Sequence, residues 1–145
     1  MSFLRGIDIA ASGMTAQRLR MDVIANNLAN AETTRTSKGG PYRRQMVIFE
    51  ERKDANKSFQ EALGRELKIG SGVRVKSIVE DSSPLRRVYD PSHPDADPEG
   101  YVNYPNVNVV EEMVDMIAAT RSYEANVTVI GSIKNMTMKA LDIGR

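Results

Sequence analysis

The sequence has 145 residues and a formal net charge of +1, because 20 lysines and arginines nearly balance 19 aspartates and glutamates. This balance gives no general attraction to nucleic acid, so we expect no nucleic-acid partner. The absence of cysteine excludes disulfides, thiol catalysis and cysteine-based metal sites. The longest apolar runs, 46–49 and 116–119, are far shorter than the roughly 20 residues of a membrane-spanning helix. We therefore expect a chain that does not span a membrane.

The N-terminal residues have the spacing of one long amphipathic helix. Apolar side chains recur every seven residues at Ile7, Met14, Met21 and Leu28. This spacing predicts a helix over residues 3–31, which ends near Asn30 because asparagine prefers caps and turns to helix interiors. Asp8 interrupts the apolar segment that a cleaved secretory signal would need. We therefore expect any export to proceed without a cleaved signal peptide.

The middle of the chain, residues 35–107, is predicted to be a small β-rich domain with loops. Short runs of β-forming residues predict strands at 42–51, 70–81 and 85–89. Residues 57–68 are interpreted as a short helix. A turn-rich acidic loop follows at residues 90–99, with three prolines and four acids between Asp90 and Glu99, and Gly100 closes it.

A second long helix is predicted over residues 109–142. Asn108 is a good N-cap, and Glu111 follows three residues later, which makes an asparagine version of the capping box. Beyond this cap, apolar side chains alternate in steps of three and four, with Thr120 on the same stripe. We expect the stripe to pack through Met113, Met116, Tyr123, Val127 and Ile130.

The order of elements predicts an α+β fold in which a β-rich insertion separates two long helices. Both predicted helices are about 30 residues, or roughly 45 Å, long. Their apolar stripes are matched in length, so we expect them to pair as an antiparallel coiled-coil layer. This layer defines a helical domain formed by residues 1–34 and 108–145, with the middle domain at 35–107. Both stripes are wider than one seam, which leaves apolar surface for neighbouring subunits.

No motif in the sequence predicts catalysis, a cofactor or a metal. His93 lies among acidic residues, but their spacing does not match a calcium-binding loop, and we interpret the segment as a solvated acidic turn. The sequence has no Gly-x-Ser-x-Gly elbow that would supply a nucleophile for this single histidine. Residues 70–72 lack the lysine of a phosphate loop and are read as a turn. We expect neither an enzyme nor a small-molecule substrate.

Two polar segments leave alternatives open. Arg43 and Arg44 belong to a basic loop at 35–44, interpreted by default as solvated and alternatively as a contact to the acidic loop of a neighbouring subunit. Exposed ion pairs contribute only about 0–1 kcal/mol each, so this contact would set register more than affinity. The amides of Asn26, Asn27 and Asn30 are read either as a frayed helix end or as hydrogen-bonding groups at a subunit interface.

The stretch "MDVIANNLANAETTRT", residues 21–36, resembles the asparagine-rich signature of the axial proteins of the bacterial flagellum, which include rod, hook and hook-associated subunits. The stretch "VNVVEEMVDMIAATRSYEANV", residues 107–127, is similar to the C-terminal helix of the same family. The segments around "PYRRQ" and "DPSHPDADPEGY" resemble the proximal-rod members. The likeness covers nearly the whole chain and is weakest at residues 52–82.

This resemblance implies a structural subunit of the basal-body proximal rod, which polymerises helically through its terminal helices. Such a subunit would form part of the drive shaft between the membrane ring and the distal rod and hook. It implies export through the flagellar type III apparatus and a final location in the periplasm or cell-wall zone. The expected partners are further copies of the chain, other rod proteins and the membrane-ring adaptor.

Two alternatives remain from the sequence. The chain would be another axial rod subunit if the motifs of the middle segment are misassigned. It would be a partner-binding helical protein of export or regulation if the amphipathic helices bind a cytosolic partner. The presence of the chain in purified basal bodies distinguishes the rod assignment from this second alternative.

Overall fold

The computed structural model describes residues 2–52 and 70–143. Helix α1 (Ser2–Ala29) is followed by strands β1 (Gln45–Glu51), β2 (Val73–Glu80), β3 (Arg86–Tyr89) and β4 (Tyr101–Tyr104), and then by helix α3 (Val109–Ile143). This arrangement confirms the predicted α+β class, with two long terminal helices and a small β region between them. The predicted short helix at 57–68 lies outside the described residues.

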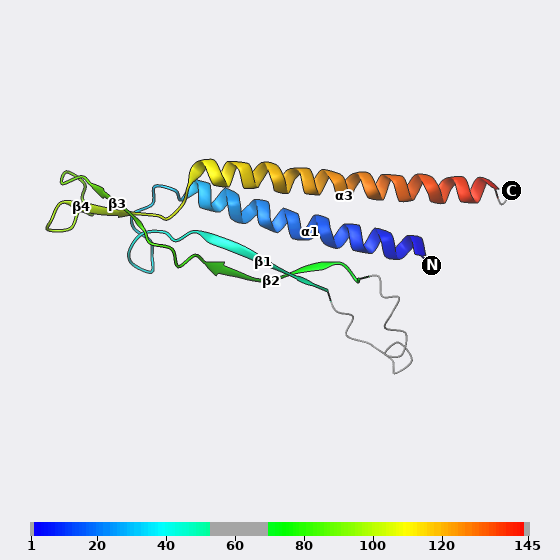
Figure 1. Ribbon diagram of the computed structural model, residues 1–145, viewed down its shortest axis with the longest axis horizontal. Helices are drawn as coiled ribbons and strands as arrows, with labels where there is room; N and C mark the ends of the chain where they lie inside the picture. The colour runs from blue at the N-terminus through cyan, green and yellow to red at the C-terminus, as the bar shows by residue number, and fades with distance from the viewer. Residues whose placement is uncertain (1, 53–69, 144–145) are drawn as a thin grey trace, which may run out of the picture.

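The two helices run antiparallel, and both chain ends lie at the same end of the molecule (Figure 1). At 1.5 Å per residue, α1 is about 42 Å and α3 about 52 Å long. Helix α1 lies between α3 and the hairpin formed by β1 and β2, and it contacts both (Figure 1). Helix α1 therefore packs against two partners within the chain, whereas α3 packs mainly against α1.

The β region consists of two separate antiparallel hairpins. Strand β1 pairs with β2 along the length of α1, and the register shifts between Ile48 and Phe49. Strand β3 pairs with β4 beyond the N-terminal end of α3 (Figure 1). Strand β4 is missing from the predicted set, because four residues give too short an alternation to be distinguished from the loop signals around them.

The β1–β2 hairpin is fixed to α1 by a close backbone contact. Ser12 Oγ donates a hydrogen bond to the Ile9 carbonyl and accepts one from the Val73 amide, at 2.7 and 3.1 Å. Gly72 has φ of +102°, and a Cβ there would collide with Ser12 Oγ. Only glycine adopts this conformation without strain and leaves room for the hydroxyl. The start of β2 is thus held against the middle of α1.

The helix ends follow the predicted caps closely. Helix α3 starts where expected, and Asn108 caps it: its Oδ1 accepts from the Val110 amide at 3.1 Å and its carbonyl from the Glu112 amide at 3.0 Å. Helix α1 ends at Ala29, two residues before the predicted end at 31. There the Asn30 side chain donates to the Asn26 carbonyl at 2.9 Å, which satisfies a carbonyl of the last turn.

Candidate subunit interface

The asparagine-rich end of α1 forms a buried polar junction with β1 and α3. Asn27 is 1% exposed and uses its whole amide. Its Nδ2 donates to the Gln45 carbonyl at 2.9 Å and to Glu112 Oε2 at 3.0 Å. Its Oδ1 accepts from the Gln45 amide at 2.9 Å and from the Tyr42 hydroxyl at 2.9 Å. Two donors and two acceptor sites are the full capacity of an amide side chain, so Asn27 is completely satisfied.

Glu112, in the first turn of α3, is the second buried member of this junction and is also 1% exposed. Arg44 Nε donates to Glu112 Oε1, while Asn27 occupies the other carboxylate oxygen. The guanidinium of Arg44 also reaches Asp115 Oδ2 at 3.3 Å. A buried carboxylate is tolerated only when it is paired and hydrogen-bonded, and Glu112 meets both conditions.

Electrostatics favour the protonated forms of Tyr42 and Arg44 in the junction. Burial raises the pKa of the Tyr42 hydroxyl, and the carboxylates of Glu112 and Glu80 raise it further. Tyr42 therefore stays protonated and donates to Asn27. Burial acts to lower the pKa of Arg44, but the hydrogen bond to Glu112 and the charges of Glu112, Asp115 and Asp81 together outweigh burial and leave this pKa above its ordinary value. Arg44 is accordingly a permanent cation.

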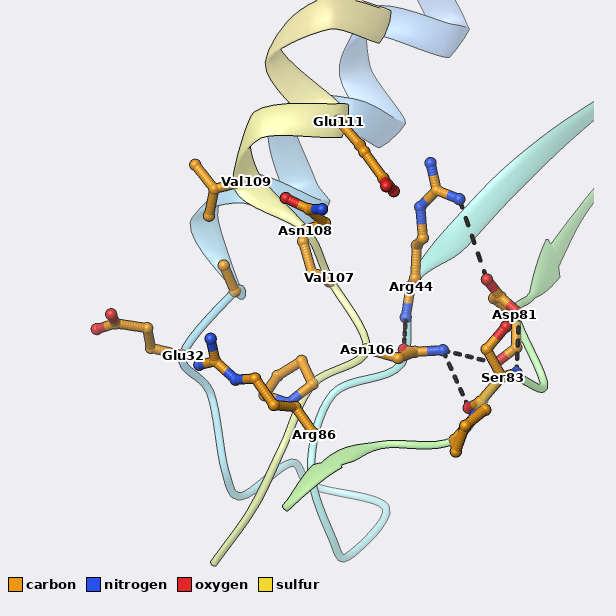
Figure 2. A pocket seen from close by; sticks show the side chains of 13 residues that line it. Glu32, Arg44, Asp81, Ser83, Arg86, Asn106, Val107, Asn108, Val109 and Glu111 are labelled. Carbon is orange, nitrogen blue, oxygen red and sulfur yellow. Dashed lines mark hydrogen bonds and ion pairs between the residues drawn. The ribbon is translucent and has the colours of Figure 1, made fainter. Parts of the chain in front are cut away.

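A second group of polar contacts connects the junction to the β3–β4 hairpin. Asn106 Oδ1 accepts from the Arg44 amide at 2.9 Å, and its Nδ2 donates to the carbonyls of Asp81 and Ser83 at 3.2 and 3.3 Å (Figure 2). These residues line a cleft of about 690 Å³ beside the N-terminus of α3. Arg44, Asp81 and Asn106 bond to one another, so they bind the strands together at the cleft wall.

The seam between the two helices is built from small side chains on α1. A Cβ on Gly6 would lie 3.0 Å from Ile133 Cδ1, and a Cβ on Gly13 would lie 3.0 Å from the amide atoms of Asn126. Ala119 is fully buried in α3. These small residues bring the two helices close together. On α3 the buried or half-buried positions alternate in steps of four and three along Glu112, Met116, Ala119, Tyr123, Asn126, Ile130 and Ile133.

The opposite face of α3 is apolar near its N-terminus but is not covered by the rest of the chain. Four side chains with the spacing i, i+3, i+4 and i+7, each 55–68% exposed, form this outer face: Val110, Met113, Val114 and Ile117. This spacing places them on one side of the helix. A contiguous exposed apolar patch of this kind is typical of a protein interaction site.

The predicted interface residues fall into different environments. On α1, the four stripe residues are half-buried: Ile7, Met14, Met21 and Leu28. On α3, Met116, Tyr123 and Ile130 are half-buried on the seam, whereas Met113 and Val127 are exposed. Met21 Sδ lies 3.5 Å from Thr120 Oγ1, at the edge of the helix contact. The stripe on α3 thus divides between the seam and the surface outside it.

The three asparagines also differ from one another. Asn27 bonds within the chain, as described. Asn26 is exposed and donates to the Tyr42 hydroxyl at 3.2 Å. Asn30 is half-buried, bonds Asn26 Oδ1 at 3.0 Å and accepts from Thr33 at 3.2 Å. These bonds order the helix end, so the reading of a frayed end is wrong.

The default interpretation of the basic loop at 35–44 as solvated is wrong for Arg44. Arg44 is not solvated: it pairs with Glu112 and Asp115, because β1 begins where α1 and α3 converge. Glu112, Ala119 and Asn126 were absent from the predicted packing residues. Their spacing of seven residues was the available signal, but a search for apolar side chains overlooks a glutamate and an asparagine on the seam.

The acidic loop is ordered by local hydrogen bonds. Asp90 accepts from the Ser92 amide and hydroxyl at 3.1 and 2.6 Å. These bonds lower the pKa of Asp90. Thr34 donates to Asp95 at 2.9 Å within the same chain. In the ranges 2–52 and 70–143, no cluster of histidine and acidic residues has the arrangement of a metal site, and neither long helix is apolar enough to cross a membrane.

Comparison with protein families matches both ends of the chain. The family described as flagella basal body rod protein matches residues 7–35. The family described as flagellar basal body rod FlgEFG protein C-terminal matches residues 99–143. These segments contain Asn27 and Glu112 respectively, together with the outer face of α3. The class that emerges is that of the rod proteins of the flagellar basal body.

Individual relatives match over the full chain. A protein of Borreliella burgdorferi named flagellar basal-body rod protein FlgC is 54% identical, with 99% of this chain and 98% of that protein covered. Proteins with the same name from Bacillus subtilis and Salmonella typhimurium are 46% and 41% identical over all of both chains. The chain belongs to the FlgC family of flagellar basal-body rod proteins.

Proposed function

We propose that this chain is a structural, non-enzymatic subunit of the proximal rod in the flagellar basal body. Full-length relatives that are named as rod proteins support this assignment. The subunit polymerises helically with copies of itself and with other rod proteins, and contacts the membrane-ring adaptor. The resulting shaft transmits torque from the membrane ring to the distal rod and hook.

The observation that carries the assembly mechanism is the uncovered outer face of α3. Helix α1 occupies one side of α3, while Val110, Val114 and Ile117 remain exposed on the other. Burying an exposed apolar side chain of this size contributes about 1.5–3 kcal/mol. A neighbouring helix that covers all four side chains of the face therefore gains enough to stabilise a helical layer of subunits.

The two parts of the chain have separate roles in the proposed rod. Residues 1–34 and 108–145 form the inner helical layer, and residues 35–107 form the outer, β-rich domain. The four stripe residues of α1, which are spaced seven positions apart, provide the apolar contacts between subunits together with Met113 and Val127 of α3. Asn26 and Asn30 add polar contacts at the end of α1, while Asn27 acts inside the chain.

The location follows from the same assignment. The chain is made in the cytoplasm, passes through the flagellar type III export apparatus without a cleaved signal, and takes its place in the periplasm or cell-wall zone. The cellular location of the chain tests this route.

Fractionation of a flagellated cell tests the proposal. Peptides of the chain should copurify with hook-basal bodies after detergent and alkaline extraction, in amounts comparable with other rod proteins. A soluble cytosolic partner complex, with no peptides in the basal bodies, would contradict the rod assignment and favour the regulatory or export role.

A further inference from the structure

We propose that the buried junction of Asn27, Glu112 and Arg44 is a register lock, which fixes the alignment of α1 against α3. This inference concerns a single chain and does not depend on the role of that chain in the rod. It assigns to the asparagine-rich end of α1 a function within the fold.

The contact between the helices is repetitive, so its register needs a separate determinant. Gly6 faces Ile133 and Gly13 faces Asn126, which are pairs separated by seven residues on both helices. Asn27 and Glu112 lie a further fourteen residues along each helix, in the same series. A slip of one heptad, about 10.5 Å along the axis, would again place positions of this series opposite one another, so the spacing alone does not select the alignment.

The junction is the buried position of this series at which the two facing side chains hydrogen-bond to each other. If α3 slipped so that Ala119 lay opposite Asn27, a methyl group would replace the Glu112 carboxylate. Glu112 would move to the level of Thr34, beyond the end of α1, and Arg44 and Asn27 would lose their carboxylate partner. Each buried polar group left without a partner costs about 1–3 kcal/mol, so the slipped alignment is disfavoured.

A polar lock of this kind selects an alignment more than it adds stability. Buried ion pairs are replaced by apolar residues with little loss of stability, and their best-attested use is to specify register. Asn27 bonds the backbone of β1 as well as the Glu112 side chain of α3, because it contacts both the amide and the carbonyl of Gln45. The lock therefore closes only when α1, β1 and α3 are all in place.

The absence of cysteine allows a direct test by engineered cross-links in the full-length chain. Met21 and Thr120 are in contact, so Met21→Cys with Thr120→Cys reports the observed register. Met21→Cys with Met113→Cys, or with Val127→Cys, reports a slip of one heptad in either direction. After oxidation with diamide, the intramolecular cross-link is measured as faster migration on a non-reducing gel.

With the junction intact, the observed-register pair should cross-link about tenfold more than either slipped pair, as expected for a polar determinant of register. In the double variant Asn27→Leu, Glu112→Leu this ratio should fall to within about threefold, because leucine packs on a heptad seam in any register. The matched control Asn135→Leu, Glu111→Leu changes an exposed asparagine and an exposed glutamate outside the junction and should keep the original ratio.

Equal yields of all three pairs with the junction intact would overturn the proposal, and so would an unchanged ratio in the leucine double variant. If that variant loses its helical circular dichroism, the three pairs are compared in Asn27→Ala, which removes the amide without adding bulk. The slipped pairs should then gain at least about threefold relative to the observed-register pair. No gain in Asn27→Ala would overturn the register lock.

Discussion

Asn27 and Glu112 are 85 positions apart in the sequence, and the Asn27 amide lies 3.0 Å from the Glu112 carboxylate in a site closed to solvent. This contact brings together the C-terminal end of α1 and the N-terminal end of α3. Arg44, at the entrance to β1, completes the site from the middle domain. These three side chains therefore join the two helices to the start of the β-rich domain.

Arg44→Met should lower the free energy of unfolding by about 3 kcal/mol, because it leaves the Glu112 carboxylate buried without its cation. Urea denaturation of the full-length chain measures this loss. Arg43→Met is the matched control, since Arg43 donates a long hydrogen bond, 3.4 Å, to the Asp81 carbonyl. This control should change stability by less than about 0.5 kcal/mol. Equal losses in the two variants would contradict the assigned importance of Arg44.

Gly13→Val should destabilise the helix pair by about 1–3 kcal/mol, because the added side chain overpacks the seam against Asn126. Gly131→Ala is the opposite case: beyond the adjoining turns of α3, no atom of the described residues lies within 4 Å of the position of its Cβ, so it should stabilise α3 by up to about 1 kcal/mol. Thermal unfolding followed at 222 nm compares the two. A stabilised Gly13→Val chain would show that the helices are not in close contact there.

Asp81 gives a prediction about acid stability. Hydrogen bonds from the Ser83 hydroxyl and amide lower the pKa of Asp81, and the charges of Arg44 and Arg43 act in the same direction. A carboxyl group with a lowered folded-state pKa contributes stability that is present above its ordinary pKa of 3.8 and is lost as the pH falls through the folded-state value.

Ser83→Ala should therefore raise the pKa of Asp81 towards its ordinary value and flatten the loss of stability below about pH 4. Carbon-detected NMR titration of the carboxyl group measures the pKa, and urea midpoints across acid pH measure the stability. Ser82→Ala changes the exposed neighbouring serine and should leave both curves in place. An unaltered Asp81 titration in Ser83→Ala would remove the assigned cause.

The long helices and the class of the fold were predictable from the sequence because amphipathic periodicity is a local signal. Helix α3 begins at Val109, as the Asn108 cap predicts, and β1, β2 and β3 lie inside the predicted strand segments. Strand β4 was not predictable, because its four residues lie directly between the loop signals of Gly100 and Pro105.

The junction was less visible than the helices for a physical reason. Asn27 stands out in the sequence as a polar residue near an apolar stripe, but its partners lie 18 and 85 positions away. Glu112 reads as an ordinary acidic residue in the first turn of a helix, where acids are favoured by the helix dipole. Only the convergence of α1, β1 and α3 shows that this carboxylate is buried.

The division of the α3 stripe has a similar origin. Periodicity finds the apolar positions of a helix but does not tell which of them its own chain covers. Met116 is drawn into the seam because it shares the spacing of Glu112 and Ala119, while Met113 is left exposed. An unusually wide apolar surface, with hydrophobic residues on both sides of α3, is the sequence property that indicates a second partner.

The central claim, that the outer face of α3 joins subunits in the rod, is tested most directly by the composition of basal bodies from cells that carry Val114→Asp. These basal bodies should lack the chain and the cells should not swim, although the free energy of unfolding of the purified variant should stay within about 0.5 kcal/mol of that of the original chain, as expected for an exposed position. Val114→Ile, which keeps the face apolar, should leave both assembly and swimming intact. Basal bodies that incorporate the Val114→Asp chain at the normal level would contradict the claim.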